Sequence, residues 1–481
     1  MTATENRKPK LGFKQLAEKL RQDIETNKLS YGAPLPPSRS MAEQLGVSRD
    51  TVVSAYNVLE NQGYIESDGR RGTFVSFKSD LKLPRTSTES ELLSLSKIGK
   101  SLLSHTKVQR TASPNPDELT SFNFGAVPRE ALPLRQWREL LLKRVQSTKN
   151  LSLEYTPNVF GREEFRDALA QYLAHTKGIR AQKEEIAVFN ISITAVDILL
   201  TLLMESGDCI AIEDPGYPAI EQLAHKHQLS IATLPVDDKG AQVEFLAALN
   251  PKPKLIYVTP DSHDPTGTTL SLNRRLELLA WANANNAWII EDAFDGFFRY
   301  GEAAPPALKA LDTEGRVLYL STFWQVLYPL ATTSYLLMPP NIATVFRAAK
   351  ALTDGIAETM PQLILADMLK SGFLNGHTRR WNKIFAARRR TLIFNLTQKF
   401  GKDVNVLPFS AGLHCVIELE NFPPELVMRA AKAAKLPLQE IHSRFHSTKQ
   451  HRYICYFAGL NESTIESCVM IFAELAYNTS T

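Results

Sequence analysis

The sequence predicts an α/β domain built on a mostly parallel sheet, preceded by a small helical domain that ends in a β-hairpin, and followed by a small C-terminal α+β lobe. At 481 residues the chain is too long for one ordinary domain. Apolar residues recur at helical spacing near the N-terminus, whereas from Phe122 onward short apolar bursts alternate with helical stretches. We therefore expect a small domain at residues 1–78, a flexible linker at 79–120 and the large domain at 121–481.

Composition narrows the class of protein. The 44% hydrophobic and 22% charged residues are typical of a soluble globular protein, and the formal charge of +4 is small for this length. The four cysteines lie far apart without a CxxC motif, which favours buried reduced thiols. The polar N-terminus has no signal-peptide pattern, and the apolar run around residues 198–204 is too short to span a bilayer. We expect a protein of the bacterial cytoplasm without a membrane partner.

Three helices are predicted in the first domain. Apolar residues recur at helical spacing from Phe13 to Lys28, which predicts the first helix. Ser38 is expected to cap a second helix that ends at Gly46, and Ser48 a third helix that ends near Gly63. A turn of about four residues between the second and third helices is the spacing of a helix-turn-helix.

A β-hairpin with two arginines at its tip is predicted after the third helix. Tyr64–Glu66 and Thr73–Val75 are its strands, and a polar turn joins them, as in a wing. The run LPPSRSMAEQLGVSRDTVVSAYNVLENQGYIESDGRRGTFV, residues 35–75, resembles the winged helix-turn-helix of the GntR family of transcription regulators nearly position by position. The family resemblance implies binding to double-stranded promoter DNA.

The resemblance also assigns roles to individual residues. Arginine can contact guanine through two hydrogen bonds, and backbone amides at a helix start favour phosphate, so the physical chemistry agrees with those roles. The residues that the resemblance implies at the DNA are Arg39, Ser48, Arg49, Thr51, Arg70, Arg71 and Gly72. Asp50 departs from the family pattern: it either lowers non-specific affinity or accepts a hydrogen bond from a cytosine amine. The alternative is a structural hairpin of helices whose arginines are only solvated.

The linker is rich in Ser, Thr, Pro and Lys, with one helical patch at residues 92–103. This composition predicts a mobile tether. The family resemblance implies a head-to-tail homodimer, in which the DNA-binding domain packs on the partner subunit.

The large domain is predicted from its apolar strands. These are Cys209–Ile212, Leu255–Val258, Trp288–Ile290, Val317–Leu320 and Tyr335–Met338, with a C-terminal lobe that holds strands near 413–419 and 453–457 and a closing helix at 463–477. The motifs EDPGYPA, TPDSHDPTG, AWIIEDAFDGFFRY and AGLH are similar to those of fold-type-I aminotransferases, over nearly all of residues 122–478. Together with the N-terminal domain, they resemble the MocR-type subfamily of GntR regulators, whose fold is that of pyridoxal-phosphate (PLP) transferases.

The segment RVLYLSTFWQVLYPLATTSYLLMP resembles the loop that carries the Schiff-base lysine in that family. Gln325 stands at the lysine position, and a glutamine amide cannot form an imine with PLP. Trp324 replaces a serine that holds the phosphate, and its bulk is expected to fill the space. Thr332 replaces the phosphate-binding arginine.

Other positions that the family uses for PLP also differ. Ile191 and Ile193 replace a glycine and a polar residue of the phosphate cup at a helix start. Phe294 replaces the tyrosine, and Asp264 the asparagine, that bind the PLP phenolate oxygen. Arg452 lies near the position of the substrate-carboxylate arginine but out of register. We therefore expect no catalytic residue and no covalent PLP.

Two positions keep the residue type that the family uses to contact PLP. Asp292 stands where the family's aspartate pairs with the pyridine nitrogen, and Tyr217 where an aromatic ring stacks on the cofactor. The alternatives are that Asp292 caps a turn and that Tyr217 packs in the core.

Two further clusters favour structural roles. Six basic residues between Arg379 and Arg390 lie on a predicted long helix, where a solvated or interface face is favoured over a second DNA contact. His442, His446 and His451 have no nearby Cys or carboxylate, so we expect a surface loop and no metal.

The sequence therefore predicts a homodimeric, nucleoid-associated DNA-binding regulator whose large domain serves as dimerisation body and as sensor of an unknown small-molecule effector. Three alternatives stay open. The large domain could be a PLP-dependent aminotransferase-type enzyme, a sensor that binds PLP without a covalent bond, or a scaffold without a ligand.

Overall fold

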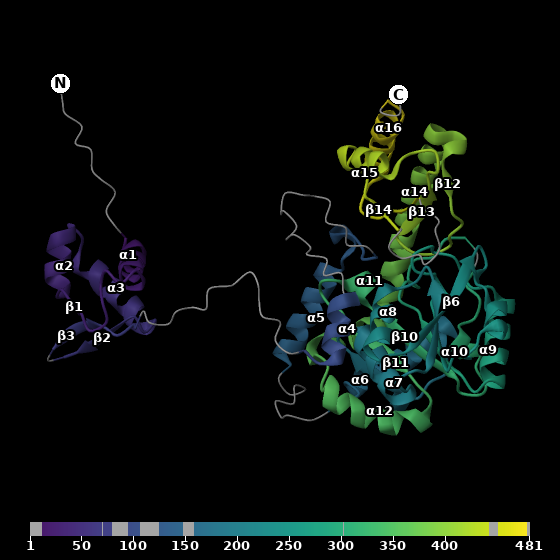
Figure 1. Cartoon of the computed structure of the whole chain (residues 1–481), viewed down its shortest axis with the longest axis horizontal. Coiled ribbons are helices and arrows are strands. Elements are labelled where there is room, and N and C mark those ends of the chain that lie inside the picture. The colour runs from purple at the N-terminus through teal and green to yellow at the C-terminus, as the bar shows by residue number, and fades with distance from the viewer. Residues whose placement is uncertain are drawn as a thin grey trace. The chain divides into compact units, whose positions relative to one another are not determined.

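The computed structural model describes residues 12–69, 71–78, 95–105, 125–147, 158–301, 303–441 and 451–478. The chain divides into two compact units, Met1–Leu95 and Ser96–Thr481 (Figure 1). Of the residues singled out above, Arg70, His442 and His446 lie outside the described residues, as does most of the expected linker.

The small unit is a winged helix-turn-helix, as predicted. Its elements are α1 (Phe13–Glu25), β1 (Pro34–Leu35), α2 (Ser38–Leu45), α3 (Arg49–Asn61), β2 (Ile65–Asp68) and β3 (Gly72–Val75). The three strands form an antiparallel sheet in the order β1-β3-β2. Leu20, Val52 and Leu59 are buried between the helices, and Val75 joins their cluster from β3.

The helix starts in this unit differ from the prediction at one position. The Ser48 hydroxyl accepts a hydrogen bond from the Thr51 backbone N–H at 3.2 Å and caps α3, as expected. The prediction that Ser38 caps α2 is wrong, because Ser38 is already the first helical residue and Pro37 occupies the cap without a side-chain hydrogen bond. Gly46 ends α2 with a left-handed φ of +65°, which suits glycine.

The large unit is built on an eight-stranded sheet in the order β4-β11-β10-β9-β8-β5-β6-β7. Its strands are β4 (Ile186–Phe189), β5 (Cys209–Asp214), β6 (Ser230–Asp237), β7 (Gly240–Ala241), β8 (Leu255–Val258), β9 (Trp288–Asp292), β10 (Val317–Thr322) and β11 (Ser334–Leu337). Strands β10, β9, β8, β5 and β6 are parallel, whereas β11 runs antiparallel to both of its neighbours. All five predicted strands are confirmed, and β4, β6 and β7 were not predicted.

Helices cover both faces of this sheet (Figure 1). The α-helices described between residues 125 and 370 are α5 (Leu134–Gln146), α6 (Glu163–Lys177), α7 (Ser192–Leu203), α8 (Pro218–Lys226), α9 (Leu272–Ala284), α10 (Leu308–Leu311), α11 (Trp324–Leu327), α12 (Pro340–Thr353) and α13 (Thr359–Lys370). On β5, Ile210 and Ile212 belong to the apolar cluster with α7, whereas Ala211 between them belongs to the cluster with α9. This alternation buries both faces of the sheet.

One helix lies within the expected linker. Helix α4 (Lys97–His105) packs against α8, so this stretch belongs to the large unit. The helical patch expected at 92–103 is thus formed a few residues later in the chain.

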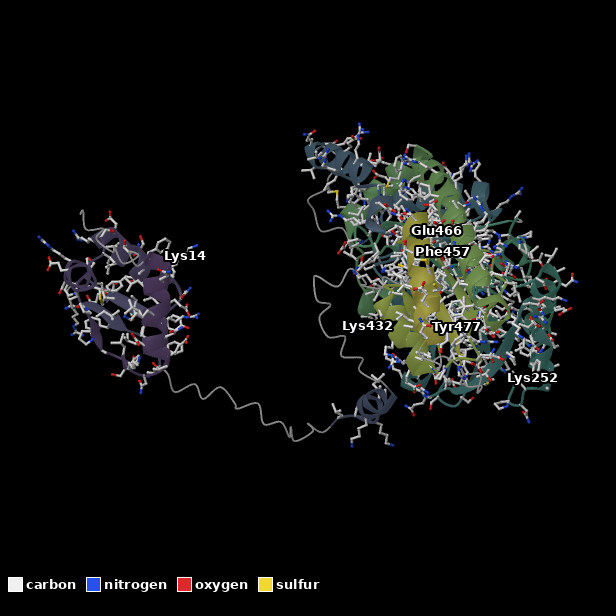
Figure 2. The ribbon with its side chains drawn as sticks, turned by 90° about the horizontal axis from the view of Figure 1, so that it is seen from above. Lys14, Lys252, Lys432, Phe457, Glu466 and Tyr477 are labelled. Carbon is white, nitrogen blue, oxygen red and sulfur yellow. The ribbon has the colours of Figure 1, made fainter. Side chains whose placement is uncertain are left out.

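The C-terminal lobe is α+β, as predicted. It contains α14 (Phe373–Phe400), β12 (Asn405–Val406), β13 (His414–Glu418), α15 (Pro424–Ala433), β14 (Leu438–Glu440), β15 (Arg452–Tyr456) and α16 (Glu462–Asn478). Its strands form an antiparallel sheet in the order β12-β13-β15-β14. In Figure 2, Lys432 marks α15 and Glu466 and Tyr477 mark α16.

The basic run on α14 is not only a solvated face. The guanidinium of Arg388 is buried, 2.7 Å from Glu130 Oε1, and it also donates to the Ala458 carbonyl. Arg389 lies over the Phe409 ring, 4.3 Å from its centroid, and donates to the Phe409 carbonyl. The prediction was a solvated or interface face, and these two residues are not solvated, because they contact neighbouring segments of the chain.

Two expectations from composition can be compared with the fold. The four cysteines, Cys209, Cys415, Cys455 and Cys468, are buried free thiols. Among the described residues, none of the helices combines the length and the apolar character that a bilayer-spanning helix needs.

Candidate DNA-binding face and ligand cavity

Arg39 and Arg49 come together on the small unit. Both line a shallow groove between α2 and α3, together with Glu43 and Gly46. The Arg39 side chain is 86% exposed, and its Nε lies 3.9 Å from Glu43 Oε1. Arg49 is exposed at the first position of α3, and its Nε lies 3.5 Å from the Ser38 hydroxyl. The two guanidinium groups thus share one face at the start of the predicted recognition helix.

The remaining predicted DNA residues lie at the start of α3 and in the hairpin. The Thr51 hydroxyl lies 2.7 Å from the Ser48 hydroxyl at the N-terminus of α3. Arg71 is exposed at the hairpin turn, where its backbone N–H donates to the Asp68 carbonyl at 3.0 Å. Gly72 opens β3 with φ +92°, a conformation that favours glycine at this turn.

A cavity of about 390 Å³ opens in the large unit beside the ends of the parallel strands β8, β9 and β10. Asp292 and Thr322 are the last residues of β9 and β10, and the start of α7 lies on another side. The lining residues are Gly125, Ile191, Ser192, Ile193, Tyr217, Tyr257, Thr259, Asp264, Asp292, Phe294, Thr322, Trp324, Thr332 and Ser334. The carboxyl ends of parallel strands are the usual place for ligands in such sheets.

The cavity gathers most of the residues that the sequence singled out. Ile191, Tyr217, Asp292, Phe294 and Thr332 all line it. Tyr217 is 39% exposed, so the alternative that it packs in the core is wrong.

Trp324 forms a wall of this cavity. Its ring packs over Gly125, where an added Cβ would lie only 3.2 Å away, and against Tyr328 with 5.3 Å between ring centroids. A cavity persists beside the indole, and that this ring fills the space of the phosphate stays a prediction.

Asp292 is the central polar residue of the cavity. It is 6% exposed, and its Oδ2 accepts a hydrogen bond from the Tyr257 hydroxyl. Its Oδ1 has no hydrogen-bond partner among the described residues. Burial raises the pKa of Asp292 to about 7, with the nearby Asp264 acting in the same direction and the Tyr257 hydrogen bond opposing it. The Phe294 backbone N–H lies close enough to lower the pKa as well.

Two carboxyl groups close to Asp292 make the surroundings acidic. Asp264 lines the cavity and is 6% exposed. Glu213 is 4% exposed, and its Oε2 accepts from the Thr259 backbone N–H at 2.8 Å and from the Thr259 hydroxyl at 2.6 Å. Burial raises the pKa of Glu213, and His263 lowers it in part. No Lys, Arg or His lines the cavity in the part of the chain that the structure describes.

Gln325 does not line the cavity, although its neighbours Trp324 and Thr322 do. It is 1% exposed, and neither atom of its side-chain amide has a hydrogen-bond partner among the described residues. Its backbone carbonyl accepts from the Val127 N–H at 2.9 Å, which holds the short helix α11 in place.

Arg452 is directed elsewhere as well. It pairs with Glu418 at 2.6 Å across β13 and β15 and does not line the cavity.

Sequence reasoning missed Tyr257, Glu213 and Gly125. Tyr257 carries the one polar-tipped side chain of β8, and this could have indicated a hydroxyl at the strand end. Gly125 carries no chemical group that could have signalled its contact with Trp324.

His442 and His446 lie outside the described residues, so the expected absence of a metal at the histidine cluster stays a prediction. Within the described residues no group of three or more His, Cys, Asp or Glu is arranged to hold a metal ion. His451 is partly buried, with its Nδ1 3.2 Å from the Phe422 carbonyl.

Comparison with known families matches both units. The family "Bacterial regulatory proteins, gntR family" matches residues 13–75, and "Aminotransferase class I and II" matches residues 119–469. The probable rhizopine catabolism regulatory protein MocR of Rhizobium meliloti is 30% identical over 458 residues, which cover 94% of this chain and 91% of that protein. The HTH-type pyridoxine biosynthesis transcriptional regulator PdxR of Corynebacterium glutamicum is 28% identical, with 94% and 93% covered.

Solved structures agree on the fold of the large unit. A kynurenine aminotransferase of Pyrococcus horikoshii superposes with a TM-score of 0.67 at 23% identity, covering 74% of this chain and 90% of that one. A multiple substrate aminotransferase of Thermococcus profundus gives 0.68 at 24% identity, covering 82% and 98%.

Proposed function

Because the chain belongs to the MocR-type transcriptional regulators, which join a gntR-family helix-turn-helix domain to an aminotransferase class I and II domain, we propose that it regulates transcription through an effector cavity that forms no imine. The observation that carries this proposal is Gln325. A glutamine stands at the lysine position of the family's loop, buried and outside the cavity lining, and an amide cannot condense with an aldehyde.

The other cavity residues fit PLP poorly. A phosphate needs hydrogen-bond donors and cations, but Thr332 and Trp324 stand where the resemblance places an arginine and a serine. Asp264 would repel the PLP phenolate. Of the family positions for PLP discussed above, Asp292 is the one polar side chain that could still pair with the pyridine nitrogen of PLP. We infer that the cavity has no catalytic role and holds another small molecule, so the large unit acts as sensor and dimerisation body.

At the DNA, Arg39 and Arg49 would contact phosphate or bases from the groove of α2 and α3, with Ser48 and Thr51 fixing the start of α3. Arg70, Arg71 and Gly72 of the wing would follow the backbone or enter the minor groove. Two copies in a head-to-tail homodimer would present two such faces to one promoter at the nucleoid.

The test uses the purified full chain with added PLP. We expect no imine absorbance between about 330 and 430 nm beyond that of free PLP, and no covalent mass increase after borohydride, since only a reduced imine leaves the cofactor attached to the chain. The same preparation should bind its own promoter with an affinity that falls steeply with salt. A reducible adduct or turnover of amino acids would contradict the proposal in favour of a PLP enzyme. A spectral shift without an adduct would indicate a sensor that binds PLP without a covalent bond.

A further inference from the structure

The charges that line the cavity point to the class of its ligand. Its lining carries two carboxyl groups, Asp264 and Asp292, and no basic side chain among the described residues. Glu213 lies close enough to raise the pKa of Asp292 further. A ligand that carries a phosphate or carboxylate at this end would add a negative charge to an acidic, weakly solvated site, where like charges repel strongly.

One oxygen of the Asp292 carboxyl group also lacks a hydrogen-bond donor among the described residues. Its Oδ2 accepts a hydrogen bond from Tyr257, whereas Oδ1 has no partner among the described residues. Asp292 is only 6% exposed, so water has little access to Oδ1. A buried acceptor without a partner is costly, and a donor supplied by a ligand relieves that cost. A charged N–H donor does so most strongly.

Aromatic rings make up much of the remaining wall. Tyr217, Phe294 and Trp324 line the cavity together with Tyr257. The faces of such rings attract cations and stack on flat ligands. The volume of about 390 Å³ lies within the range of small-molecule sites and accommodates a ligand of one or two rings.

We propose that the cavity binds a small aromatic amine without a phosphate group, with its ammonium donating to Asp292 Oδ1 and its ring lying among Tyr217, Phe294 and Trp324. This inference rests on the proposed function, because it names the ligand class of the effector cavity.

One feature of the lining favours an anion instead. Ser192 and Ile193 at the start of α7 present a helix N-terminus, which is equivalent to roughly half a positive charge. Ile191 occupies its cap position, and no side chain caps the helix. A single ionised carboxylate outweighs this half charge, and the cavity has two carboxyl groups.

The test is isothermal titration of the full chain with three ligands that share an indole ring: tryptamine, a cation; tryptophol, which is neutral; and indole-3-acetate, an anion. We expect tryptamine to bind at least about tenfold more tightly than the other two, the size of a charge-assisted hydrogen bond. PLP and inorganic phosphate should bind more weakly than tryptamine.

Two variants and a matched control tie this preference to the cavity. Asp292→Asn should weaken tryptamine binding about tenfold or more. Asp295→Asn should leave it within about twofold, because Asp295 is also a buried aspartate with an unpartnered Oδ1 but does not line the cavity. Thr332→Arg should reverse the order, so that indole-3-acetate binds more tightly than tryptamine. Thermal melting of each variant checks that it is folded.

Tighter binding of indole-3-acetate, phosphate or PLP than of tryptamine would overturn the inference, as would equal losses in Asp292→Asn and Asp295→Asn. Promoter binding of the same preparation separates the two proposals. A chain that binds its promoter but not tryptamine contradicts only the ligand class, whereas a chain that binds tryptamine but no DNA contradicts the proposed function.

Discussion

The DNA-binding face of the small unit and the cavity of the large unit place their charged groups in contrasting environments. The side chain of Arg39 is 86% exposed, and solvent screens its charge from its neighbours. The carboxyl group of Asp292 is 6% exposed, and its pKa depends on Tyr257, Asp264 and Glu213. Substitutions on the face should therefore act independently of one another, whereas a substitution in the cavity should change the protonation and ligand preference of the whole site.

The largest effect is expected for the double variant Arg39→Ala and Arg49→Ala. Each arginine should contribute about 1–3 kcal/mol to specific promoter binding, and the two losses should add. Fluorescence anisotropy with the chain's own promoter, at two salt concentrations, measures both the affinity and the salt slope, which should become shallower.

The matched control for this experiment is Arg21→Ala. It removes the same charge from α1, where Arg21 pairs with Glu18 at 2.7 Å outside the groove. Promoter affinity should change little in this variant. An unchanged affinity in the double variant would show that the recognition face lies elsewhere.

A smaller, pH-dependent effect is expected for Asp292→Asn. The pKa of Asp292 is raised from 3.8 to about 7, so between about pH 4 and pH 7 the carboxyl group is ionised in the unfolded wild-type chain but stays protonated in the folded one, and stability falls as pH rises. Asparagine can still accept the Tyr257 hydrogen bond, but it does not ionise. The variant should thus gain stability relative to the wild type over this window, by up to about 4 kcal/mol.

Thermal melting at about pH 4 and pH 8 measures this difference. The groups that face Asp292 are the Tyr257 hydroxyl, Asp264 and Glu213, and burial raises the pKa of Tyr257 and of Glu213 as well. Asp295→Asn is compared with Asp292→Asn, because burial also raises the pKa of Asp295. This variant should therefore also gain stability relative to the wild type as pH rises. An Asp292→Asn variant that is less stable than the wild type at pH 8 would contradict the raised pKa, because it would mean that the folded chain stabilises the carboxylate.

Much of the fold could be predicted because its signals are local. Strands such as β8 and β10 are short apolar runs between polar turns, and the helix-turn-helix has its glycine and serine at the turn. Strand β6 was missed because Pro235 and its mixed, half-buried residues weaken the pattern. Strand β4 was missed because four apolar residues directly follow a charged turn.

The cavity was harder to predict because it depends on contacts between distant segments. The Tyr257 hydroxyl reaches Asp292 since β8 and β9 are parallel with Tyr257 opposite Ile290, two residues before Asp292. The residue types at the cavity could be taken from the resemblance, but this register could not. The position of the Trp324 ring depends on Gly125, which lies about 200 residues earlier.

Ser48→Ala is expected to lower the free energy of unfolding by about 1 kcal/mol more than Ser38→Ala does. Ser48 caps α3 through the Thr51 N–H, and loss of such a cap typically costs that amount. Ser38 lies inside the first turn of α2 and caps nothing, so its substitution should be nearly neutral. Urea unfolding, monitored by the fluorescence of a label on the small unit, compares the two variants. Equal losses of unfolding free energy would contradict the assigned cap.

Gln325→Lys is expected to have the smallest effect, with no gain of covalent PLP binding. The chemistry of the family would suggest the largest effect for this variant, because it restores the Schiff-base lysine. Imine formation needs a neutral amine that reaches the aldehyde. The side chain at position 325 is buried and outside the cavity lining, and the carboxyl groups of Asp264 and Asp292 would favour a lysine in its protonated form. Thr332 offers no charge to hold the PLP phosphate. Intact mass after PLP and borohydride should therefore show no adduct in this variant, whereas the combination with Trp324→Ser, Thr332→Arg and Ile191→Gly should show one. An adduct in the single variant would mean that one missing amine, and not the charge of the whole cavity, separates this site from a PLP site.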